Sequence, residues 1–153
     1  MKLGPAVVAL LWAAAAAAQP APADRKVVET CLTEKSKTHD QEKCIGVIAD
    51  ACLEKGDDPS THGMADCSRR EHAVWDDRLN RLYRKLMTEA DNATRVKLRE
   101  MQRAWIAFEE KKCGFHYVAE PGSASIPMIA YCSMTETGRQ ALFLERVFGV
   151  EEQ

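Results

Sequence analysis

The sequence predicts an all-α fold, a small disulfide-stapled helical bundle built around an antiparallel helical hairpin. Apolar residues recur at the spacing of a helix face in two neighbouring stretches, Trp75, Leu79, Leu82 and Leu86, then Leu98, Met101, Trp105 and Phe108. No stretch alternates apolar and polar residues for long enough to predict a strand. The chain also has six cysteines, an even number that fits disulfide staples.

The N-terminus has the pattern of a secretory signal peptide. Lys2 precedes an apolar run that reaches Ala18 and is too short to span a bilayer. We therefore expect residues 1–18 to be a signal peptide and residues 19–23 to be a flexible Pro/Ala segment. This predicts a periplasmic or secreted protein of the bacterial envelope, without stable membrane insertion.

The cysteines of an exported chain are expected to form disulfides. They are Cys31, Cys44, Cys52, Cys67, Cys113 and Cys132. Pairing in sequence order would join neighbouring helices. A Cys67–Cys113 bond is the alternative, because both residues would lie at the open end of the hairpin, and it would direct Cys52 towards Cys132 or an N-terminal partner. Histidines near Cys67 and Cys113 raise the question of a zinc site. Disulfide formation uses those thiols, so we expect no metal and no cofactor.

The first elements form an N-terminal helical extension over residues 24–58, which contains three of the cysteines. A short helix is expected from Asp24 to about Lys35. Thr38 to Gln41 has the form of a capping box. It predicts a second helix that ends at Lys55, before Gly56, with an inner face formed by Ile45, Ile48, Ala49 and Cys52.

The hairpin itself is expected to consist of a helix from near His62 to about Ala90 and a second one from about Thr94 to Lys112. The polar connection between them is short, which favours antiparallel packing. Trp105 lies in the middle of its apolar stripe, so it is expected to anchor the core against Leu79 or Leu82. Four polar residues beside the stripes are expected to tie the two helices together, namely Asn80, Tyr83, Gln102 and Arg103.

The chain changes character after Cys113. Residues 119–127 contain two prolines and a glycine, which predicts a loop. A short helical turn is expected from Met128 to Cys132. Thr135 is then expected to cap a last helix that ends near Gly149.

The ordered motifs resemble the LprI-type lysozyme-inhibitor family of small exported bacterial envelope proteins. They are Gly63-Met64-Ala65-Asp66-Cys67, Trp75-Asp76 with Leu79-Asn80, Tyr83 and Leu86, Gln102-Arg103-Ala104-Trp105-Ile106 with Phe108, Cys113, Gly122-Ser123, Pro127-Met128, Cys132, and Thr135 with Arg139 and Leu142. The resemblance implies a helical, cysteine-containing domain over residues 63–148 that binds a lysozyme. Glu109-Glu110 departs from the Arg-Asp-like pair usual after Phe108.

The resemblance directs attention to the segment from Phe115 to Pro127. A muramidase holds two acidic groups in a sugar-binding cleft, so an inhibitor needs hydrogen-bond donors beside an aromatic side chain. The candidate partner-binding residues are His116, Tyr117, Ser123 and Ser125. The two serines could equally serve to turn the chain.

The alternative function is an envelope structural or protein-interaction module with no lysozyme target, which would use the charged face of the hairpin. An enzyme is not expected, because Asp76 and Asp77 are adjacent and point to different sides of their helix. A net charge of −2 argues against a nucleic-acid partner.

Overall fold

The computed structural model describes residues 19–149, which are helical and contain no strand. In chain order the elements are α1 (Pro22–Ser36), η1 (Gln41–Cys44), α2 (Ala49–Lys55), α3 (Thr61–Glu89), α4 (Asn92–Gly114), α5 (His116–Ala119), η2 (Gly122–Ala124) and α6 (Ser125–Phe148). The predicted all-α, disulfide-stapled bundle is confirmed. The expected signal peptide, residues 1–18, lies outside the described residues. None of the helices between residues 19 and 149 is long and apolar enough to cross a membrane.

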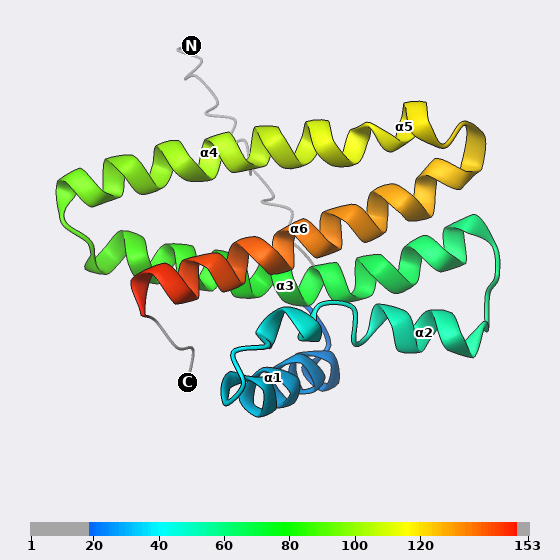
Figure 1. Cartoon of the computed structure of the whole chain (residues 1–153), viewed down its shortest axis with the longest axis horizontal. Helices are drawn as coiled ribbons and strands as arrows, with labels where there is room; N and C mark the ends of the chain where they lie inside the picture. The colour runs from blue at the N-terminus through cyan, green and yellow to red at the C-terminus, as the bar shows by residue number, and fades with distance from the viewer. Residues whose placement is uncertain (1–18, 150–153) are drawn as a thin grey trace, which may run out of the picture.

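The central unit of the bundle is α3 packed against α6, and the predicted hairpin of α3 and α4 is not confirmed as that unit. The two helices follow each other through a short turn, but α3 contacts α6 far more extensively than it contacts α4. Figure 1 shows α3 and α6 running in the same direction, while α4 returns the chain in the opposite direction. α4 therefore covers α6 at the edge of the bundle.

The hydrophobic core is centred on Trp75, which is fully buried in α3. The prediction that Trp105 anchors the core is wrong, since that side chain is only partly buried and packs at the margin. Phe108, one turn further on, is half exposed. The physical reason is the edge position of α4, which leaves part of its apolar stripe without a covering helix.

The predicted second helix is broken into η1 and α2 by a turn around Gly46. The backbone of Gly46 has a φ of +106°, in a region that favours glycine. The predicted capping box does not form, because the Thr38 hydroxyl donates to the Lys35 carbonyl instead. The buried carboxylate of Glu71, in α3, accepts hydrogen bonds from the backbone N–H groups of Gly46, Ile48 and Ala49 at 2.6, 2.8 and 2.9 Å. A side chain from another helix thus serves as the cap of α2.

The N-terminal extension packs directly on the bundle. Asp24 is buried in α1 and accepts two hydrogen bonds from the guanidinium of Arg70 in α3. Gly138 lets α6 approach Ile45 closely, because a Cβ atom at this position would lie 2.9 Å from Cγ1 of Ile45 and 3.2 Å from Cδ2 of Trp75. The boundary between the extension (24–58) and the domain at 63–148 stays a prediction.

The ends of the long helices follow local sequence signals. The Ser60 hydroxyl accepts a hydrogen bond from the Gly63 N–H at the start of α3, and the Asp91 carboxylate accepts one from the Thr94 N–H at the start of α4. The last helix ends next to Gly149, as predicted, and Gly149 itself has a left-handed conformation. Thr135 does not begin a helix, because α6 is continuous and the Thr135 hydroxyl donates to the Tyr131 carbonyl one turn back.

The three disulfides join neighbouring elements in sequence order: Cys31–Cys44, Cys52–Cys67 and Cys113–Cys132. The sequential pairing is therefore confirmed, and the alternative Cys67–Cys113 bond is absent. Each bond closes a short stretch of chain, so the cysteines fix how each element leaves the one before it.

Candidate functional site

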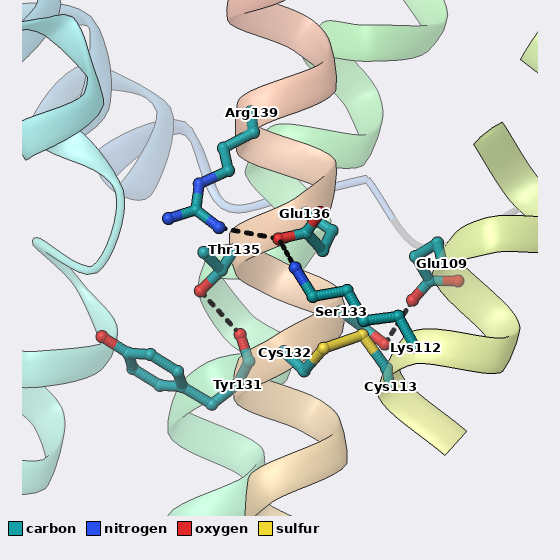
Figure 2. Close-up of polar contacts among 9 residues, drawn as sticks. All are labelled: Glu109, Lys112, Cys113, Tyr131, Cys132, Ser133, Thr135, Glu136 and Arg139. Carbon is teal, nitrogen blue, oxygen red and sulfur yellow. Dashed lines mark hydrogen bonds and ion pairs between the residues drawn. A yellow bond between two sulfur atoms is a disulfide. The ribbon is translucent and has the colours of Figure 1, made fainter. Parts of the chain in front are cut away.

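The candidate site lies at the end of the bundle where the chain passes from α4 through α5 and η2 into α6. Cys113–Cys132 joins the last turn of α4 to α6 close to this end (Figure 2). Beside the disulfide, the Ser133 hydroxyl donates to Glu109 of α4 at 2.6 Å. The disulfide and this hydrogen bond hold the base of the site to the bundle.

Glu136 strengthens the same junction. Its carboxylate, which is mostly buried, accepts hydrogen bonds from Lys112 of α4 and from Arg139 one turn further along α6, both at 2.8 Å (Figure 2). Burial alone would raise the pKa of Glu136, but the hydrogen bonds from these two cations outweigh burial and lower its pKa. The charged form of Glu136 is therefore favoured in the folded protein.

Tyr131 points to the opposite side of α6 from this junction (Figure 2). Partial burial raises the pKa of its hydroxyl, and the negative charges of Asp50 and Glu71 act in the same direction. The Tyr131 phenol thus stays protonated at neutral pH and belongs to the contact between α6 and the N-terminal extension.

The exposed part of the site is a set of residues that we call the tip surface: Phe115, Tyr117, Val118 and Ser123. The exposed fraction is 64% for Phe115, 70% for Tyr117 and 75% for Val118. Ser123 is exposed in η2. Large apolar side chains exposed together at one end of a small protein are typical of a surface that contacts another molecule.

The four predicted site residues fall into different environments. Tyr117 and Ser123 are exposed on the tip surface, whereas His116 is partly buried. Its Nδ1 atom is buried and has no hydrogen-bond partner among the described residues. Ser125 is buried as the first residue of α6, and its hydroxyl donates to the Gly122 carbonyl at 2.8 Å. Ser125 therefore turns the chain, which was the alternative role considered for the loop serines.

The segment is more helical than its prolines and glycine suggested. α5 follows Phe115 almost without a break, and α6 begins before Pro127. Proline is well tolerated in the first turn of a helix, where no backbone N–H donor is needed, so Pro127 fits the start of α6. The sequence reasoning did not single out Phe115 and Val118. Phe115 belongs to the aromatic run Phe115-His116-Tyr117, which is the sequence signal that could have found it.

No group of three or more histidine, cysteine, aspartate or glutamate residues within residues 19–149 is arranged to hold a metal ion. All six cysteines are paired in disulfides. The arrangement at the tip offers aromatic surface and a few polar groups, which suits binding.

The model of the family described as "Lysozyme inhibitor LprI" matches residues 52–144, more than half of the chain. This chain belongs to the LprI lysozyme-inhibitor family. The matched region contains two complete disulfides, Cys52–Cys67 and Cys113–Cys132, together with the whole tip surface. The Cys31–Cys44 bond of the extension lies before it.

A relative of this LprI family member is the "Uncharacterized 17.7 kDa protein in puhA 5'region" of Rhodobacter capsulatus. It is 28% identical over 156 residues, which cover 92% of this chain and 93% of the relative. The similarity thus includes the N-terminal extension. No solved structure matches this chain.

Proposed function

We propose that this protein is an exported inhibitor of a lysozyme-like muramidase and that it binds the enzyme through the tip surface. Membership of the LprI family carries the proposal, because the family is described by lysozyme inhibition. Three disulfides are typical of a protein that works outside the cytoplasm, in the periplasm or beyond the cell.

The tip surface supports the choice of binding site. Tyr117 supplies an exposed aromatic ring, the kind of side chain that contributes most to protein interfaces. The Tyr117 hydroxyl, the Ser123 hydroxyl and the His116 ring can donate hydrogen bonds to the acidic groups of a muramidase cleft. The Cys113–Cys132 disulfide keeps this end in place, so little conformational entropy is lost on binding.

The proposal predicts inhibition that depends on the tip surface. The oxidised chain from Gln19 onward should slow cell-wall lysis by at least one lysozyme in a panel drawn from different structural classes. The double variant Tyr117→Ala with Ser123→Ala should bind that lysozyme at least about tenfold more weakly, because it removes an exposed aromatic contact and a donor. Biolayer interferometry measures the dissociation constant directly.

Phe143→Ala is the matched control. Phe143 is also an exposed aromatic residue, but it lies near the C-terminal end of α6, away from the tip surface. It should leave the affinity unchanged. Unchanged affinity of the double variant, with the helical circular dichroism intact, would exclude the tip surface. Failure of the wild type against every lysozyme would contradict inhibition itself and favour an envelope interaction module.

A further inference from the structure

A second candidate site lies in an open hollow between α3 and the first half of α6, with a volume of about 410 Å³. Tyr117 of the short helix α5 forms one side of it. The hollow is lined from three separate elements, so its shape depends on the packing of the whole end of the molecule.

The hollow combines an apolar floor with a polar rim. Ile126, Ile129 and Ala130 of α6 line it at spacings i, i+3 and i+4, and they are partly or fully buried. The rim on α3 consists of His62, Arg69 and His72 at spacings i, i+7 and i+10. Spacings of this kind place side chains along one face of a helix.

Arg69 has a guanidinium group with capacity for a ligand. Its Nη1 atom donates to the Asp66 carboxylate at 2.7 Å, and more than half of each of these two side chains is exposed. An exposed ion pair of this kind is weak, because water competes for both partners. The pair uses one of the five N–H groups of the guanidinium, so a carboxylate on a ligand can be bound by the others.

We propose that this hollow binds an N-acetylated sugar that carries a carboxylate, the chemistry of the glycan strands that muramidases cleave. The exposed Tyr117 ring offers an apolar face for the sugar ring, and the isoleucine floor accepts the methyl group of the acetamide. Arg69 binds the carboxylate, and the exposed imidazole of His62 bonds to a hydroxyl or amide group. Nε2 of His72 lies 3.2 Å from the Thr137 hydroxyl, so His72 contributes to the rim mainly by its shape. The hollow would hold the protein on the cell wall, a function separate from inhibition of the enzyme.

The test compares two disaccharides by isothermal titration calorimetry with the oxidised protein. One is the N-acetylglucosamine–N-acetylmuramic acid unit, which has a carboxylate, and the other is the N-acetylglucosamine dimer, which has none. The acidic disaccharide should bind more tightly. Arg69→Gln should weaken its binding about tenfold and leave the neutral dimer unaffected, because the variant loses only the contact to the carboxylate.

Arg84→Gln is the matched control, since Arg84 is an exposed arginine near the other end of α3, away from the hollow. It should bind both sugars as the wild type does. The proposal would be overturned if the wild type binds neither sugar, or if Arg69→Gln and the wild type bind the acidic disaccharide with equal affinity. Lysozyme binding by Arg69→Gln, measured without glycan, should be unchanged, because Arg69 lies outside the tip surface. This variant therefore separates the two proposals, although both use Tyr117.

Discussion

At the scale of single residues, a small number of buried carboxylates connect the elements of this bundle. Glu71 and Asp24 are the clearest examples, because each is almost fully buried and each accepts several hydrogen bonds from another element. The Glu71 carboxylate also accepts a hydrogen bond from Nε1 of Trp75 at 2.8 Å. Loss of the Glu71 acceptor leaves buried N–H groups without partners, which costs about 1–3 kcal/mol for each group, whereas the exposed Arg70 guanidinium can bond to water if Asp24 is lost.

Glu136 should make stability depend on acidity. Its pKa in the folded protein lies below the ordinary value of 4.5. Its contribution is therefore present above pH 4.5 and is lost as the pH falls through the lower, folded value. As the pH falls from about 5 to about 3, the free energy of unfolding should decrease less for Glu136→Gln than for the wild type, because glutamine cannot take up a proton in this range. Urea unfolding at a series of pH values measures this difference.

Glu110→Gln is the control for that series, because Glu110 is an exposed glutamate on the neighbouring α4. Its stability profile should follow the wild type. A profile of Glu136→Gln that also runs parallel to the wild type would show that the contacts with Lys112 and Arg139 do not favour the charged form.

At the scale of elements, sequence patterns predicted helices better than they predicted helix contacts. α1, α3 and α4 lie within a few residues of the expected bounds, because the apolar period and the caps at Ser60 and Asp91 are local signals. The break between η1 and α2 depends on Glu71, more than twenty residues away. The one sequence signal for Glu71 as the cap of α2 is its position one turn before Trp75, on the buried face of α3.

The candidate site shows the same division. Tyr117 and Ser123 are exposed, in the segment where the sequence predicted binding residues. Ser125 is buried because α6 already begins there, whereas the prolines and Gly122 had predicted a loop at this position. The hollow joins residues of α3, α5 and α6, which are far apart in the chain. In the sequence, His62 marks the start of a helix, and His62 and His72 are among the histidines near Cys67 that raised the question of zinc. Nothing in the sequence places Ile126 and Ile129 beside them.

Two glycines in long helices should respond oppositely to larger side chains. Gly138→Val should destabilise the protein by about 1–3 kcal/mol, because the added atoms meet Ile45 and Trp75. Gly114→Ala should stabilise it by up to about 1 kcal/mol, because no atom lies within 4 Å of the added Cβ and alanine favours a helix. Thermal and urea unfolding measure both. Equal effects of the two substitutions would contradict the close contact between α6 and the turn before α2.

At the scale of the whole molecule, the disulfides divide into those that stabilise the fold and one that also serves the tip. The double variant Cys113→Ser with Cys132→Ser opens a loop with a sequence separation of 19 residues and should cost about 2–4 kcal/mol. It should also weaken lysozyme binding, because the end of α4 and the tip surface that follows it lose their covalent link to α6. Urea unfolding and biolayer interferometry measure the two effects.

The matched control is Cys31→Ser with Cys44→Ser, which opens a loop with a separation of 13 residues in the N-terminal extension. It should lower stability by a similar amount and leave lysozyme binding unchanged. If both double variants lose binding equally, the tip surface has no special dependence on its disulfide.

The shared direction of α3 and α6 makes α4 the path by which the chain returns to the starting end of the bundle (Figure 1). The length of α4 must match the distance between the end of α3 and the start of α6, whatever side chains α4 exposes to solvent. Each residue added to a helix lengthens it by about 1.5 Å and turns it by about 100°. The length of α4 therefore sets where α6 begins against α3, so this helix should accept many surface substitutions but few insertions or deletions.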